Sequence, residues 1–476
     1  MKNNAIKNVA LTLAVLMTAS VGGCGQSDGT LKYTVSETYE YEEPATFYID
    51  ILGEDVMPIM GYWGPYKDTY YNGSYLPSLQ TPEMYADVKE SGVNLIIQGN
   101  DNYRSAPDKV KNILQMCEDA GLGYLIVDSS LWSIGGDKNT DRSTWNEDQS
   151  AWNERVAEWN EYKSFAGIDL EDEPHTPSFS SIGQVAEMFK NACTANEITS
   201  KYAYVNAFPK GYLQGREGIP YTTHLDEWCT KGNPDILCYD LYPFKYDAKD
   251  NFTASAFFNN LADIYNKSKE YNVPFASFVQ VGGNWTDEGD FSGVCPPTME
   301  QLLWEVNVFL TYGAKAIYYF TLCMPHSFYK YLQYDGQTGF FDPWGNRTEW
   351  FYAGKMANEQ IAATDHILMH TNHHGVIKVG DLPGDGRITG FLSENKFRQL
   401  QSVNEDCTAL IGCMDYKGKT TLYVMNSSYY EKTEVTLSFD GNYCYDVIQR
   451  AQSASVIGKT LTLKLDPGEA ALVTLR

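Results

Sequence analysis

The chain has 476 residues, 43% of them hydrophobic, and a formal net charge of −25 at pH 7. A negative charge of this size argues against nucleic acid or an anionic membrane surface as the main partner. The 35 tyrosines and 10 tryptophans provide many side chains with an apolar body and a polar tip, which suit sugar rings as well as β-rich cores.

The amino terminus has the pattern of a secretory signal. Two lysines precede a short apolar stretch at 9–17, which is followed by "TASVGGCG". The stretch is too short to span a bilayer, so it predicts a signal peptide over residues 1–23. "VGGC" resembles the lipobox of bacterial lipoproteins, with Cys24 at the lipidated position. The resemblance implies an extracytoplasmic protein that a lipid such as palmitate anchors to the cell envelope through a flexible tether, residues 24–44. An ordinary cleaved signal with an incidental cysteine is the alternative.

The middle of the chain alternates β-rich runs with helical patterns. The eight runs cover residues 56–63, 93–99, 123–130, 165–171, 202–208, 235–242, 274–281 and 315–322. They start roughly 30–42 residues apart, which is the size of one βα unit. Their continuous apolar character is typical of parallel strands covered on both faces. Eight such units predict a (β/α)8 TIM barrel over residues 45–370.

The end of the chain changes pattern. We expect an irregular link over residues 371–399. From about Ala409, apolar residues recur with a period of two, and the turn sequences "YKGK", "DGN" and "DPGE" separate the runs. Short alternating strands of this kind predict a small antiparallel β-sandwich domain over residues 400–476.

Barrel active sites lie at the carboxyl ends of the strands. Nearly every predicted strand of this chain ends in a polar or aromatic side chain, which indicates a hydroxyl-rich ligand. The candidate substrate-binding residues are Trp63, Gln98, Asp169, Glu171, Asn206, Tyr242, Gln280 and Tyr319, together with Trp285 in the loop after the seventh strand.

The fourth predicted strand ends in an acidic cluster, "GIDLEDEP" at 167–174. If the strand stays regular, Asp169, Glu171 and Glu173 share the face that points into the barrel mouth, and Asp172 points the other way. Clustered carboxylates raise at least one pKa, which provides an acid that is still protonated near neutral pH.

Glycoside hydrolysis needs such an acid and a second group at the anomeric carbon. We predict that Glu173 is the acid and that Asp172 or Asp240 is its partner. Two other interpretations remain open. Asp172 and Glu173 could complement the dipole at a helix start, and Asp240 could belong to a buried ion pair or hydrogen-bonded core.

Several motifs resemble the barrel glycoside hydrolases, in particular the broad family 42-like, clan A group of bacterial secreted proteins. They are "GIDLEDEP", "FVQVGG" on strand seven, "TYGAKAIYYFTL" on strand eight and the following "GFFDPWGNRTEWFYAGKMANEQI". The resemblance covers most of residues 55–370. It implies an acid at the end of strand four, where Glu173 stands, and a nucleophilic glutamate at the end of strand seven, where Gln280 stands instead.

Two further resemblances would make a protein nucleophile unnecessary. The adjacent Asp172 and Glu173 resemble the pair of the acetamido-sugar hydrolases of families 20 and 123. This implies that the substrate's own acetamide attacks, that the aspartate orients it and that the glutamate is the acid. Asp169-x-Glu171-x-Glu173, with "CYDLY" on strand six, is similar to the family 18 chitinases.

The sequence therefore predicts a secreted, lipid-anchored glycosidase that acts on a polysaccharide or oligosaccharide. It predicts no cofactor and no metal. There is no C-x-x-C pattern, and Pro383 and Leu392 stand where a calcium loop needs ligands. A non-catalytic carbohydrate-binding surface lipoprotein on a hydrolase-like barrel is the alternative, which Gln280 favours. The oligomeric state stays open.

Overall fold

A computed structural model describes most of the chain beyond the predicted tether. It describes residues 44–71, 74–132, 134, 147–245, 254–282, 284–285, 291–294, 296–323, 339–382, 392 and 394–476. The predicted signal peptide and Cys24 lie outside these residues, as do the side chains of Gln98 and Trp285. Within the described part, no helix is both long and apolar enough to cross a membrane.

Eight parallel strands form the barrel, as predicted. They are β1 (Ile59–Tyr62), β4 (Leu95–Asn102), β5 (Gly123–Val127), β6 (Phe165–Asp172), β7 (Tyr202–Asn206), β8 (Leu237–Asp240), β9 (Phe275–Gln280) and β12 (Ala316–Phe320). The order in the sheet is β7-β6-β5-β4-β1-β12-β9-β8. The two edge strands meet at a parallel bridge between Ala207 and Tyr239, where the Ala207 amide donates to the Cys238 carbonyl at 2.9 Å. Each predicted β-rich run overlaps one of these strands, and β4 and β6 extend beyond the predicted ends.

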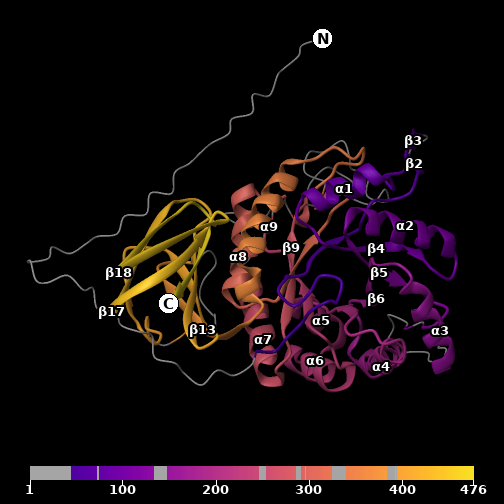
Figure 1. Ribbon diagram of the computed structural model, residues 1–476, viewed down its shortest axis with the longest axis horizontal. Helices are drawn as coiled ribbons and strands as arrows, with labels where there is room; N and C mark the ends of the chain where they lie inside the picture. Colours follow the sequence, from indigo (N-terminus) through magenta and orange to yellow (C-terminus); the bar gives the residue numbers. More distant parts are fainter. Residues whose placement is uncertain are drawn as a thin grey trace, which may run out of the picture.

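Helices follow the strands and cover the outside of the barrel (Figure 1). They are α1 (Pro82–Glu90), α2 (Pro107–Ala120), α3 (Gln149–Trp159), α4 (Phe179–Ala195), α5 (Lys210–Glu217), α6 (Tyr221–Glu227), α7 (Ala254–Tyr271), α8 (Met299–Thr311) and α9 (Glu349–Leu368). Local sequence sets their ends. Thr298 and Gln301 form a capping box at the start of α8. Gly121 ends α2 in the left-handed region, with φ of 70°.

Residues 44–53 close the floor of the barrel, at the amino ends of the strands. Phe47 and Ile49 are buried there, and the ring of Phe47 packs edge-on against Tyr202 with 5.0 Å between centroids. Lys201 donates to Asp50 at 2.8 Å. The described chain therefore begins at the floor, and the carboxyl ends of the strands form the opposite opening, which we call the mouth.

The carboxyl-terminal domain is one antiparallel sheet of β13 (Thr371–Val379), β14 (Leu400–Val403), β15 (Ala409–Tyr416), β16 (Lys419–Asn426), β17 (Thr433–Gln449), β18 (Gln452–Leu465) and β19 (Ala470–Leu475). The register of β17 shifts between Ser438 and Tyr443. Val424, Leu437 and Leu463 belong to a core that is separate from the barrel core. The predicted antiparallel domain is confirmed.

The predicted irregular link over residues 371–399 is wrong for its first 9 residues, which form β13 and pair with β15. Two histidines and a glycine hide the alternation in the sequence. His373 is buried because its ring is hydrogen-bonded on both sides, to the Tyr265 hydroxyl at 2.9 Å and to the Thr311 carbonyl at 2.8 Å. A bonded imidazole thus occupies a core position that a sequence pattern assigns to an apolar residue.

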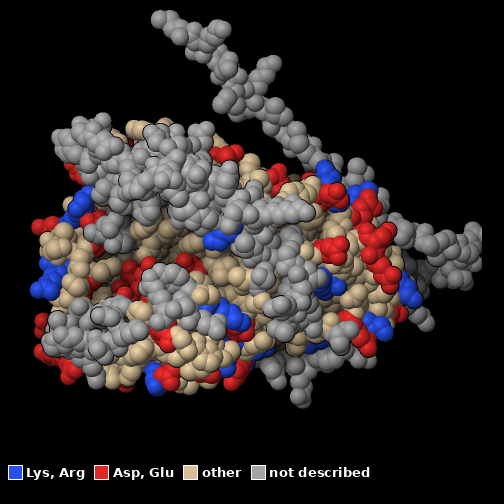
Figure 2. Space-filling view, turned by 180° about the vertical axis from the view of Figure 1, so that it is seen from behind, with Lys and Arg blue, Asp and Glu red and all other residues tan. Residues whose placement is uncertain are grey.

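The sheet packs against α8 and lies beside it in Figure 1. Trp304 of α8 donates from Nε1 to the Ser427 carbonyl at 2.9 Å, and Tyr423 donates to Asn307 of α8 at 2.7 Å. Figure 2 shows the opposite side of the molecule, where acidic side chains gather in a hollow of the surface, whereas acidic and basic ones are interspersed toward the edges.

Candidate active site

The ends of three neighbouring strands place two carboxylates within hydrogen-bond distance of the side-chain amide of one asparagine. Asn206 ends β7, between Asp172 at the end of β6 and Asp240 at the end of β8, across the seam that closes the barrel. Its Nδ2 donates to Oδ1 of Asp172 and to Oδ1 of Asp240, each at 3.0 Å. The two hydrogens of a planar NH2 group point about 120° apart. Two acceptor oxygens at this distance from the nitrogen therefore lie about 5 Å from each other. The buried Asn206 therefore fixes the spacing of the two carboxylates.

The surroundings of this pair disfavour negative charge. Burial and the nearby Asp172 raise the pKa of Asp240 to about 7, although hydrogen bonds from Asn206 and Tyr242 oppose the shift. Desolvation also raises the pKa of Asp172, although its side chain is exposed at the end of β6, and hydrogen bonds from Asn206 and Tyr62 oppose that shift. The Tyr62 hydroxyl, from β1, reaches Oδ2 of Asp172 at 3.4 Å. The pair can thus hold one proton near neutral pH.

The predicted orientation of Asp172 is wrong. Regular alternation places Asp172 on the outer face of β6, but the register of β6 against β7 shifts between Asp169 and Glu171. The shift turns Asp172 toward Tyr62 and Asn206, inside the mouth. A bulge next to a strand end is a local irregularity that the residue types alone do not reveal.

Two acids of the predicted trio, Asp169 and Glu171, precede Asp172 on β6. Burial first, and then the charges of Asp172 and Glu171, raise the pKa of Asp169 well above its usual range. Burial raises the pKa of Glu171 to about 7, and the charge of Asp172 adds to the shift. The negative charge of Asp169 also raises the pKa of the Tyr62 hydroxyl.

Glu173, the predicted acid, lies half-buried just beyond β6. Its amide donates to the Asn206 carbonyl at 2.7 Å, so its backbone is tied to the residue that bridges the aspartates. Its φ of 50° is in the left-handed region, which is uncommon for a residue with a side chain. Strained residues of this kind cluster at functional sites.

The segment after Glu173 is held by Glu217 of α5. Glu217 accepts hydrogen bonds from the Thr176 amide at 3.1 Å and the Thr176 hydroxyl at 2.6 Å, and it contacts Nδ1 of His175 at 2.5 Å. These bonds connect the loop after β6 with the helix after β7. They fix the backbone next to Glu173.

Four half-buried aromatic side chains form a wall beside the carboxylates. Ring centroids are 4.9 Å apart for Trp63 and Phe320, 5.8 Å for Tyr62 and Phe320, and 5.3 Å for Tyr242 and Phe320. Trp63 has φ of 54°, so alternation breaks and two consecutive aromatic residues face the mouth. Apolar surface next to polar acids is the arrangement that a sugar ring requires.

Gln280, a predicted binding residue, is hydrogen-bonded to the protein's own backbone. The side-chain amide of Gln280 exchanges hydrogen bonds with the backbone of Phe244, at 3.0 and 3.3 Å. The buried Gln280 therefore holds the segment after β8. The backbone amide of Gln280 donates to the carboxyl group of Glu305 of α8 at 3.1 Å. Burial raises the pKa of Glu305 well above its usual range. Glu305 is thus a buried residue whose charged form is disfavoured.

The predicted role of Tyr319 in binding is wrong. Its side chain is fully buried and points away from the mouth, because its hydroxyl donates to Asn358 of α9 at 2.8 Å. Its neighbour Phe320 faces the mouth instead. Sequence reasoning missed Phe320 and Tyr62. Strand alternation carried the signal for Phe320, since Tyr318 also points inward and bonds to Tyr202 across the barrel at 3.2 Å.

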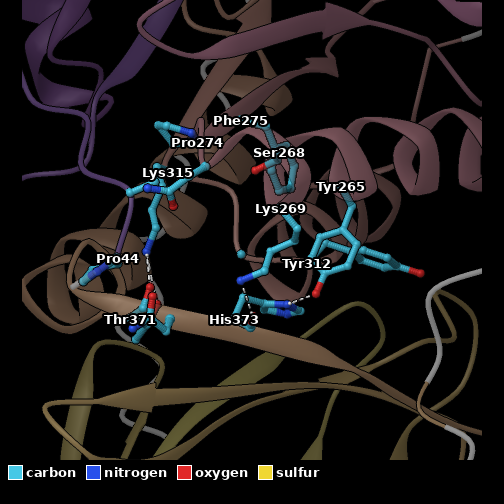
Figure 3. Close-up of a pocket in the computed structure, with 14 residues that line it drawn as sticks. Pro44, Tyr265, Ser268, Lys269, Pro274, Phe275, Tyr312, Lys315, Thr371 and His373 are labelled. Carbon is cyan, nitrogen blue, oxygen red and sulfur yellow. Dashed lines mark hydrogen bonds between the residues drawn. The ribbon is translucent and has the colours of Figure 1, made fainter. Parts of the chain in front are cut away.

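A cavity of about 50 Å³ lies at the floor end of the barrel, between residues 44–45, α7 and β13 (Figure 3). Figure 3 shows Lys315 directed at Thr371 and Lys269 directed at His373, with bonds of 2.9 Å to the two carbonyls. These lysines bind backbone groups at the junction with the C-terminal domain. No cluster of histidine, cysteine or acidic residues in the described ranges could hold a metal ion.

Many solved structures match the chain, and the three described next do so at low identity. A GH27 β-L-arabinopyranosidase from Geobacillus stearothermophilus is 11% identical, with 90% of this chain and 98% of that chain covered and a TM-score of 0.44. The α-amylase from H. orenii is 10% identical, with 89% and 100% covered and a TM-score of 0.47. A family 5 glycoside hydrolase from Bacteroides vulgatus is 8% identical, with 88% of each chain covered and a TM-score of 0.45.

At these values the likeness adds no argument on activity to the geometry of the mouth. No family model matches the sequence, and no curated protein matches it.

Proposed function

We propose that this chain is a glycoside hydrolase that uses Asp172 and Asp240 as its pair of carboxyl groups. The observation that carries the proposal is the single Asn206 amide that bonds both carboxylates at 3.0 Å. Glycosidases that retain anomeric configuration have their two carboxyl groups about 5–5.5 Å apart, and inverting ones have them further apart. The spacing that Asn206 sets, about 5 Å, supports a retaining reaction.

The two aspartates have different environments and so different roles. Asp240, with a pKa of about 7, is the acid that transfers its proton to the glycosidic oxygen as the bond to the anomeric carbon breaks. Asp172 is exposed at the end of β6, whereas Asp240 is half-buried, so contact with water, together with the hydrogen bonds from Asn206 and Tyr62, favours the carboxylate form of Asp172. Asp172 attacks the anomeric carbon and forms a glycosyl ester. Ionised Asp240 then takes a proton from water as the water oxygen attacks the anomeric carbon; the bond between this carbon and the Asp172 oxygen breaks, which releases the sugar, the Asp172 carboxylate and protonated Asp240.

Glu173 remains the acid predicted from sequence, and it is the competing candidate for the role of Asp240. Its backbone bond to Asn206 keeps it next to the pair. The aromatic wall of Trp63, Phe320 and Tyr242 supports a carbohydrate as the substrate, because its rings provide an apolar face beside the acids. An oligosaccharide or polysaccharide is the proposed substrate class.

The lipid anchor at Cys24 is part of the proposal. Pro44, the first described residue, lines the cavity at the barrel floor. A tether that ends there leaves the molecule on the side opposite the mouth, so an anchored enzyme keeps its mouth open to soluble glycans. Cys24→Ala tests the anchor. The variant should move from the detergent phase to the aqueous phase in detergent partitioning, and an unchanged partition would remove the anchor from the account.

The activity test compares the wild-type chain with Asp172→Asn, Asp240→Asn and Glu173→Gln on 4-nitrophenyl glycosides of hexoses, pentoses, fucose and N-acetylhexosamines. We expect both aspartate variants to lose at least about 10³-fold in kcat/KM, with a smaller loss for Glu173→Gln. If Asp240→Asn keeps full activity and Glu173→Gln loses it, Glu173 is the acid. Glycan binding without turnover by the wild-type chain would favour a carbohydrate-binding protein.

A further inference from the structure

We propose that Trp344 is an outer sugar-binding platform, which contacts a residue of the substrate glycan beyond the bond that is cleaved. The proposal rests on the proposed carbohydrate substrate and adds a second contact site on the mouth side of the barrel. Trp344 lies in the turn 341–347, between β12 and α9. The side chain of Trp344 is 57% exposed.

The turn 341–347 is continuous with the aromatic wall. The Cys323 amide, just after β12, donates to the Trp63 carbonyl at 3.0 Å. Cys323 also pairs with Phe341 in a parallel bridge, and the Phe341 amide donates to the Leu322 carbonyl at 3.0 Å. The first residue of the turn is thus bonded to the strand end that carries Phe320. The turn that carries Trp344 therefore begins at the carboxyl end of β12, on the mouth side of the barrel and next to this wall.

Asp342 makes the turn rigid from within. Its Oδ1 accepts from the amides of Trp344 at 2.9 Å and Asn346 at 2.8 Å, and its Oδ2 accepts from the side chain of Asn346 at 2.8 Å. The Asp342 amide donates to the Asn346 carbonyl at 2.8 Å. A carboxylate that accepts three hydrogen bonds fixes the backbone on both sides of Trp344.

Contacts on the outside hold the same turn in place. The Tyr66 hydroxyl donates to the Pro343 carbonyl. Arg347 binds Asp87 of α1 at 2.6 Å and also pairs with Glu90, and its guanidinium lies 4.5 Å from the ring centroid of Phe351. The turn therefore presents Trp344 from a fixed frame.

An exposed indole on a rigid frame contrasts with four other tryptophans of the barrel. Trp152, Trp159, Trp228 and Trp304 are fully buried, as is usual for a large apolar side chain. A preorganised aromatic side chain loses little conformational entropy when it binds a ligand. Its flat apolar face suits the apolar face of a sugar ring, while the ring's hydroxyl groups stay in water. The geometry indicates a subsite for a glycan chain and not for a monosaccharide.

The test uses Trp344→Ala, Trp344→Phe and the control Tyr430→Ala, which removes a side chain that is 62% exposed on the C-terminal domain. Activity is measured on the best 4-nitrophenyl glycoside and on oligosaccharides of two to six residues with the same terminal sugar. We expect Trp344→Ala to leave kcat/KM on the aryl glycoside unchanged and to lower it about tenfold on the longer substrates, mainly through KM. Trp344→Phe should recover part of the loss, and Tyr430→Ala should match the wild type.

Equal losses on short and long substrates, or no loss at any length, would overturn the platform. Binding separates this outcome from a failure of the proposed activity. Affinity electrophoresis in gels that contain galactomannan, xyloglucan, arabinogalactan or mucin compares Asp240→Asn with the double variant Asp240→Asn/Trp344→Ala. Retardation that needs Trp344 in a chain without turnover supports the platform even if hydrolysis is never observed, and retardation independent of Trp344 contradicts it.

Discussion

Asp172 and Asp240 accept hydrogen bonds from the same nitrogen of Asn206, each at 3.0 Å. Two carboxylates this close do not ionise independently, because each charge disfavours the other. The barrel seam provides the shared donor, since β6, β7 and β8 end next to one another there. The relationship leads to predictions on pH, on the amide and on stability.

Activity should fall as the pH rises through about 7. Asp240, whose pKa is raised to about 7, must be protonated to act as the acid, so the active form disappears above this pH. The acid limb should follow Asp172, which must be ionised. The measurement is the pH profile of kcat/KM on an activated aryl glycoside for the wild type and Asp240→Asn. A profile of Asp240→Asn that keeps the alkaline limb near 7 would assign that limb to another group.

Asn206→Ala should lower kcat by about 10²–10³-fold, because it removes the donor that holds both carboxylates. It should also move the alkaline limb to higher pH, since the lost hydrogen bond favoured the ionised form of Asp240. KM should change little. If Asn206 only stabilised the fold, Asn206→Ala would lower the amount of folded protein and leave the pH profile of the folded enzyme unchanged. Tyr319→Phe is the matched control, because it removes a buried hydrogen bond away from the mouth.

Asp240→Asn should stabilise the fold at pH 8 and not at pH 4. Between pH 4 and 7 the folded state keeps a proton on Asp240 that the unfolded chain has lost, so this group's contribution to stability falls as the pH rises through that window. Above pH 7 the folded chain carries a buried charge that asparagine avoids. We expect a gain of about 1–3 kcal/mol in unfolding free energy at pH 8, measured by urea denaturation at both pH values. Equal effects at the two pH values would refute the assignment.

Gln280→Glu should destabilise the protein and add no activity. Strand seven is where a clan A nucleophile is expected, but the Gln280 amide is committed to the Phe244 backbone and lies next to buried Glu305. A carboxylate at position 280 lacks the side-chain N–H that donates to Phe244, and it lies next to the carboxyl group of Glu305. We expect a loss of about 2–4 kcal/mol in unfolding free energy. An increase in kcat in this variant would mean that position 280 faces the substrate.

Much of the fold could be predicted because its signals are local. Eight apolar runs at regular spacing predict eight parallel strands, and for some runs the polar residue at the end predicts what faces the mouth. Asn206, Asp240 and Tyr242 were found in this way, and the structure brings them together at the mouth.

The rest depends on contacts that a single run of residues does not contain. The register shift in β6 turns Asp172 inward, and the left-handed backbone at Trp63 brings two consecutive aromatic residues to one side. Strand β13 was missed because His373 is buried through two hydrogen bonds from distant segments. Each deviation is decided by a partner far away in the chain.

Chemical rescue of Asp172→Gly by sodium azide tests the central claim most directly. With an activated aryl glycoside as substrate, azide occupies the space of the lost carboxylate and attacks the anomeric carbon, while Asp240 is still present. The account predicts that azide restores aryl release in Asp172→Gly and yields a glycosyl azide of inverted configuration, which NMR identifies. It predicts no such product for the wild type. Asp172→Gly that hydrolyses the substrate as fast as the wild type without azide would contradict the account.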